Sequence, residues 1–179
     1  MTSHVRPGVG TGPDATRRKS RGGVIGGLIG LAFGWLWLLV GSTAAGSAGT
    51  PILVGGSVLF ALAVWRGVTR EQPDSGRFNA AYYIAYIAAV VAEIVAIGAS
   101  QVWLAAHQRG DLLFPVVGII VGLHFIGLWL ASRREAFLWL TGAMVAVNLL
   151  ALLLPLSAPA RIMLSGFGSS ASLLIAVVA

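Results

Sequence analysis

The sequence predicts an all-α integral membrane protein with six transmembrane helices. Of its 179 residues, 57% are hydrophobic and only 10% are charged, and the mean hydropathy is +0.87. Soluble domains carry about 25% charged residues, so a water-soluble fold of this length could not cover so much apolar surface. Six apolar runs and the placement of the basic residues between them support the same fold class.

The chain divides into a tail and a transmembrane domain. Residues 1–21 are polar, rich in glycine and proline and without periodicity, which predicts a disordered, basic cytoplasmic tail. Residues 22–179 contain the apolar runs, at about 23–41, 50–66, 80–100, 112–131, 136–154 and 161–179. Each has about the length that crosses a ~30 Å hydrocarbon core as a helix. A signal peptide over residues 1–44 is the alternative for the first run, although that run is long for this role.

The basic residues predict that both termini face the cytoplasm. With the N-terminus inside, ten of the 12 Lys and Arg residues fall on the inner side: Arg6, Arg17, Arg18, Lys19, Arg21, Arg66, Arg70, Arg77, Arg133 and Arg134. Only Arg109 and Arg161 fall outside. This distribution is the positive-inside pattern, and it predicts a bacterial inner-membrane location with both ends cytoplasmic.

Several function classes are disfavoured. The chain has no cysteine, which excludes disulfides and thiolate chemistry. The basic residues form short clusters between the apolar runs, as membrane topology signals do, so we predict no nucleic-acid binding. No catalytic, nucleotide or haem motif occurs, and we predict no cofactor and no metal; His107 and Asp111, four residues apart, are better explained as surface groups. The expected partners are the lipid bilayer and, at "RRKSR", anionic lipid.

Two helices carry glycine faces. Gly22, Gly26, Gly30 and Gly34 recur every fourth residue, and Gly118 and Gly122 repeat the spacing in the fourth run. Such faces let another helix approach closely. The spacing does not separate packing within one chain from contact in a homo-oligomer.

A carboxylate lies among apolar residues in "VVAEIVAIGAS". On a helix, Glu93 shares its face with small and polar residues, namely Tyr82, Tyr86, Ala89, Ala96 and Ser100. The opposite face carries Ile84, Ile87, Val91, Ile94 and Val95. We therefore predict that Glu93 faces protein and that the aliphatic side chains face lipid.

Other polar groups fall within the later runs. His124 lies in the fourth run, Asn148 shares a face with Thr141 in the fifth, and a serine face in the sixth comprises Ser165, Ser169 and Ser172. From the helical rise, Glu93 and Asn148 should lie at the same depth and His124 about 8 Å deeper. This predicts no direct Glu93–His124 contact, but a bridge through water or Tyr86.

The protonation state of Glu93 is open from the sequence. An ionised carboxylate at the bilayer centre costs about 2.5–3.5 kcal/mol, and holding the acid neutral at pH 7 costs about 3.7 kcal/mol. One hydrogen-bonding or charged partner therefore decides whether Glu93 is ionised or neutral. The six tryptophans, at positions 35, 37, 65, 103, 129 and 139, are interpreted as interfacial anchors near the span ends.

The middle of the chain resembles a family of small, functionally uncharacterised bacterial six-helix membrane proteins. The shared features are Ala92-Glu93, Pro115, the Val-Gly-Leu-His-Phe motif at 121–125, and Thr141-Gly142. The sequence departs from the pattern at Ile126 and Gly127, where a proline is expected. The resemblance implies a six-helix architecture and brings no activity.

Two functional hypotheses remain. In the first, the protein is a small transporter or proton-linked permeation unit, with Glu93 as carrier and His124, Tyr86 and Asn148 as relay or lining. In the second, it is a non-catalytic scaffold or accessory subunit, and the same groups join helices by hydrogen bonds. An enzyme ranks last because no nucleophile–base pair is present.

Overall fold

The computed structural model describes residues 21–69 and 80–178, which form helices and short connections with no strand among them. The helices are α1 (Arg21–Ala44), α2 (Gly49–Thr69), α3 (Ala80–Ala106), α4 (Leu113–Ser132), α5 (Ala136–Leu153) and α6 (Ala158–Val178). Short 3-10 turns, η1 (Gly46–Ala48) and η2 (Gly110–Leu112), precede α2 and α4. The all-α prediction is confirmed; all but the last residue of the predicted tail lie outside the described residues.

Five segments of the described chain are long and apolar enough to cross a membrane: Gly46–Arg66, Tyr86–Ala106, Gly110–Ser132, Ala136–Leu153 and Ala158–Val178. In α1, the stretch Leu28–Ala44 is a shorter apolar helix. These lengths and compositions indicate a multi-pass membrane protein, because an apolar helix satisfies its own backbone groups in lipid.

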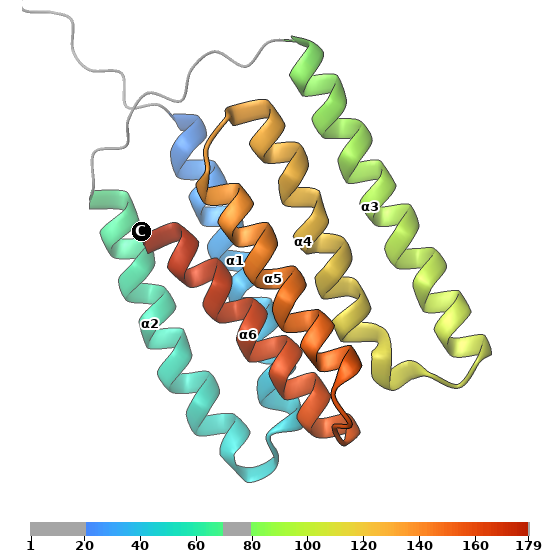
Figure 1. Cartoon of the computed structure of the whole chain (residues 1–179). Helices are drawn as coiled ribbons and strands as arrows, with labels where there is room; N and C mark the ends of the chain where they lie inside the picture. The colour runs from blue at the N-terminus through green and yellow to red at the C-terminus, as the bar shows by residue number, and fades with distance from the viewer. Residues whose placement is uncertain (1–20, 70–79, 179) are drawn as a thin grey trace, which may run out of the picture.

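The helices run up and down through one bundle, so that the described beginning of α1 and the end of α6 lie at the same end (Figure 1). Prolines support the helix starts. Pro51, Pro115 and Pro159 each lie in a first turn, where a missing N–H removes no intrahelical bond. At the end of α4, Arg133 adopts the left-handed conformation, with φ 56°, and its N–H bonds to Trp129 O.

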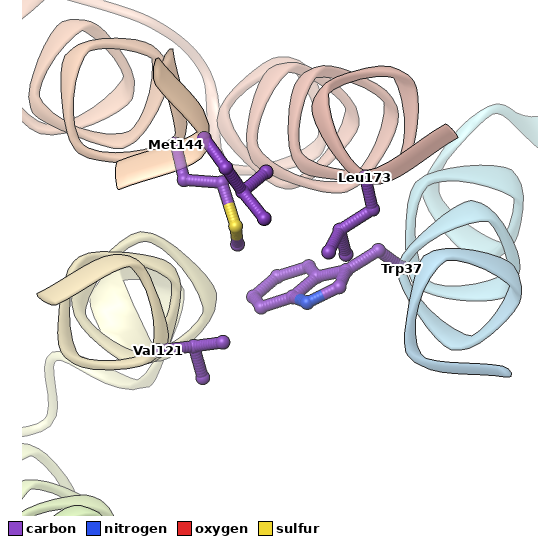
Figure 2. Close-up of a cluster of buried hydrophobic side chains, with 5 residues drawn as sticks. Trp37, Val121, Met144 and Leu173 are labelled. Atoms are coloured by element: carbon purple, nitrogen blue, oxygen red, sulfur yellow. The ribbon is translucent and has the colours of Figure 1, made fainter. Parts of the chain in front are cut away.

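The core lies where α1, α4, α5 and α6 meet. Trp37, Val121, Leu140, Met144 and Leu173 form one buried cluster, and Figure 2 shows the indole of Trp37 reaching from α1 toward the side chains of the other three helices. The interfacial-anchor prediction is wrong for Trp37, which is 6% exposed. Because α1 continues to Ala44, Trp37 lies about 10 Å inside its end.

Glycines bring α1 and α6 into close contact. A Cβ on Gly166 of α6 would fall 2.4 Å from Gly41 N of α1. A Cβ on Gly34 of α1 would fall 3.3 Å from Leu173 Cβ of α6 and 2.7 Å from the Phe60 ring of α2. Gly30 faces Val177. Gly30 and Gly34 therefore pack within the chain, whereas Gly22 and Gly26 lie outside the residues whose surroundings the structure describes. The Gly41–Gly166 contact was not predicted, since neither residue belongs to the four-residue glycine repeat.

Helices α2 and α3 lie at opposite edges of the bundle (Figure 1). α2 packs against α1 and α6, and α3 packs against α4 and η2. Trp35 of α1 donates from Nε1 to Ser57 Oγ of α2 at 2.9 Å. The position of α3 matters for function because it carries Glu93.

Candidate functional site: an intramembrane carboxylate and imidazole

Glu93 lies on the face of α3 that packs against α4. Its side chain is 17% exposed, whereas the aliphatic residues of the opposite face are 42–70% exposed: Ile84, Ile87, Val91, Ile94 and Val95. The predicted division of α3 into a protein face and an outward apolar face is confirmed. Helical periodicity alone predicts this division.

The partner of Glu93 is His124 of α4. Nδ1 of His124 lies 3.2 Å from Oε2 of Glu93, and the His124 side chain is only 10% exposed. This distance is within ion-pair range, yet Nδ1 forms no hydrogen bond of good geometry with any described residue. The two groups therefore touch without an aligned hydrogen bond, which needs a rotation of the imidazole or of the carboxylate to form.

The predicted depth difference between Glu93 and His124 is wrong. The prediction ends the apolar run around Glu93 at residue 100, but α3 continues to Ala106. Glu93 is therefore the midpoint of its helix, and His124 lies about 2 Å from the midpoint of α4. With both side chains at nearly the same depth, direct contact replaces the expected bridge.

Aromatic rings surround the imidazole. Tyr86 lies about two helical turns before Glu93, and its ring centroid is 5.7 Å from that of His124 in an edge-on arrangement. Phe125 contacts His124 edge-on at 6.1 Å. Nearby, Gly127 leaves room for Ala89, whose Cβ would lie 3.4 Å from a Cβ on the glycine. Edge-on contacts of this kind help to hold the imidazole ring at the contact between α3 and α4.

Asn148 forms a different polar cluster, between α5 and α6. Its Nδ2 donates to Met144 O at 2.8 Å and to Ser169 Oγ at 2.9 Å, and its Oδ1 accepts from Ser165 Oγ at 2.6 Å. Asn148, Ser165 and Ser169 are all 0% exposed. Because Asn148 faces Gly118 of α4, it lies on another side of α4 from His124 and does not meet Glu93.

The remaining predicted polar groups bond to their own helices. Thr141 Oγ1 donates to Phe137 O, and Ser172 Oγ donates to Gly168 O. Such bonds to the preceding turn satisfy a hydroxyl inside an apolar helix. These two residues therefore add nothing to either polar cluster.

An ion pair missed by the sequence analysis joins η2 to α6. Arg161 Nη1 binds Asp111 Oδ2, and Arg161 Nε donates to Ala151 O at 3.0 Å, near the end of α5 where carbonyls lack helical partners. His107 instead stacks on Trp103, with centroids 4.3 Å apart. Within residues 21–69 and 80–178, no three His, Asp or Glu side chains gather in a way that could hold a metal ion.

No family model, curated protein or solved structure matches the chain. In the structure, the Ala92-Glu93 segment of α3 and the Val-Gly-Leu-His-Phe segment of α4 meet through the contact between Glu93 and His124.

Proposed function

We propose that the protein is a six-span protein of the bacterial inner membrane in which the Glu93–His124 pair binds and releases a proton as part of proton-linked transport. The observation that carries the proposal is the 3.2 Å contact between a carboxylate and an imidazole at the centres of two apolar helices. Ionisable groups at such depth are costly in lipid and are typical of proton pathways.

The chemistry of the pair suits a single exchangeable proton. With one proton bound, the pair is neutral overall, whether as carboxylate with imidazolium or as carboxylic acid with imidazole. Losing that proton leaves one negative charge, which the surrounding apolar side chains stabilise poorly. The proton can move between Nδ1 of His124 and Oε2 of Glu93 when the imidazole turns so that Nδ1 points at Oε2.

The proposed orientation places both termini in the cytoplasm and makes α1 the first of six spans. The basic residues at the α2 and α4 ends support it, since Arg66, Arg133 and Arg134 occur at the end of the bundle where α6 terminates, while Arg109 and Arg161 occur at the other. This is the arrangement that positive-inside insertion produces.

A scaffold or accessory subunit is the second candidate, and the Asn148 cluster favours it. That cluster is sealed, satisfied by hydrogen bonds and suited to holding α5 against α6. In this alternative the Glu93–His124 contact likewise only holds α3 against α4. The two candidates differ in one observable property, which is proton movement across the membrane.

Proton uptake into proteoliposomes separates the candidates. We expect vesicles with an internal pH-sensitive dye and an imposed potassium-diffusion potential to acidify in the presence of the protein, and Glu93→Gln to abolish this uptake. Glutamine keeps the size and hydrogen-bonding capacity of the side chain but cannot exchange the proton. His124→Gln should slow uptake at least about tenfold, as loss of an acid–base partner costs.

The matched control is Ser100→Ala. Ser100 lies on the same helix and bonds only to its own backbone at Ala96 O, at 2.7 Å, so this variant should retain uptake. Thermal unfolding of each variant in detergent verifies that the bundle is intact. Equal rates for wild-type protein, Glu93→Gln and protein-free vesicles would instead favour the scaffold.

A further inference from the structure

Helix α3 is less embedded in the bundle than the helices that form the core. It packs against α4 and η2, and Figure 1 shows it at the edge of the bundle beside α4. Its Ile97 adds a partly buried side chain to the core cluster. Most of its remaining described surface is aliphatic and exposed, up to 73% at Val102. A helix held along one face can shift without repacking the core.

Around Glu93 the seam between α3 and α4 contains small side chains, whereas farther along α3 the larger Ile97 is partly buried and Leu104 is buried. Ala89 faces Gly127, and Ala96 lies on the same face of α3 as Glu93. Among the described residues, Glu93–His124 is the polar side-chain contact that crosses this seam. Small side chains interlock little, so the docking of the part of α3 around Glu93 depends on that contact.

The charges facing this contact are few. Among the side chains that the structure describes, α3 adds Tyr86, α4 adds His124 itself, and Asp111 of η2 is bound by Arg161 at the far end of the helix. With one proton on the pair, a carboxylate can face an imidazolium, and the two attract strongly in a medium of low dielectric. With no proton, or with two, only one of the two groups is charged, and the attraction between opposite charges is lost. The number of protons on the pair therefore alters how tightly α3 docks.

We propose that α3 is the moving element of the protein, and that the proton occupancy of Glu93 and His124 controls its docking on α4. The helices α1, α4, α5 and α6 form the fixed body, joined by the buried core and the Asn148 cluster. The inference rests on the proton binding of the proposed function. It adds that proton exchange at this pair moves α3 relative to the other helices.

Spin-label distance measurements test the inference cleanly because the chain has no cysteine. Val102→Cys in α3 and Leu153→Cys in α5 are exposed sites at the same end of the bundle. Between about pH 5 and about pH 8, the range in which histidine changes charge, we expect their distance distribution in lipid nanodiscs to shift by more than about 2 Å. The control pair, Leu36→Cys in α1 with Leu153→Cys, should not shift.

The pair itself is tested by adding Glu93→Gln to the labelled protein, with His124→Gln as a second variant should the first fail to fold. The pH-dependent shift should disappear in either background and persist with Ser100→Ala. A wild-type distance that is constant with pH while proton uptake continues would overturn the inference and leave the proposed function standing. A shift that survives both substitutions would also overturn it, since other groups would then control α3. A shift that depends on Glu93 without any uptake would support the moving helix and contradict transport.

Discussion

At the scale of single residues, Asn148 of α5 packs directly against Gly118 of α4. The amide of Asn148 makes three hydrogen bonds and has no exposed surface. It fits there because Gly118 has no side chain: a Cβ at that position would lie 2.3 Å from two atoms of the amide. Close approach of α4 and α5 and satisfaction of the buried amide therefore depend on each other.

Gly118→Ala should destabilise the protein by about 1–3 kcal/mol, the usual cost of overpacking a tight core. The added methyl group must displace Asn148 from Ser165 and Ser169, which leaves buried polar atoms unpaired. Gly142→Ala is the matched control, because a Cβ there meets nothing within 4 Å. Reversible unfolding in mixed micelles measures both; equal stabilities for the two variants would show that the amide does not need the space.

The residue-level features of the candidate site were predictable to different degrees. The protein-facing side of Glu93 follows from helical periodicity. The contact with His124 does not, because it depends on where α3 ends and on which helix lies next to it. The Arg161–Asp111 pair spans 50 residues and has no local sequence pattern at all. Trp37 was misassigned since tryptophan is common both at membrane interfaces and in cores.

At the scale of helices, apolar runs locate elements well and their ends poorly. α4 and α5 begin and end close to the predicted limits. α3 continues past the predicted limit to Ala106, because Gln101 is a single polar residue and the apolar run resumes directly after it, over residues 102–106. That extension moves Glu93 to the middle of its helix and accounts for the contact with His124.

Neighbour relations between helices follow from small residues more than from hydropathy. α1 and α6 are far apart in sequence, yet Gly41 and Gly166 bring their backbones together. A four-residue glycine repeat pointed to tight packing of α1 without naming its partner. The partner could not be predicted, because any helix with a matching small residue would have met the same requirement.

For the whole molecule, the alternating helices and the basic residues lead to a testable orientation. In a chain without native cysteine, single cysteines report sidedness directly. Gln108→Cys, between α3 and α4, should react with a membrane-impermeant maleimide added to intact cells. Glu135→Cys, between α4 and α5, should react only after the membrane is permeabilised. The reverse labelling pattern would contradict the proposal that both termini are cytoplasmic.

The central claim is that a proton enters and leaves the Glu93–His124 pair inside the membrane. Infrared difference spectroscopy of the protein in lipid measures this directly, through the carbonyl stretch of a protonated carboxylic acid. We expect a carboxylic-acid band whose intensity grows as the pH falls. This band should be missing from the spectrum of Glu93→Gln and retained in that of Ser100→Ala. A Glu93 band that is constant throughout the pH range in which the protein stays folded would contradict the claim.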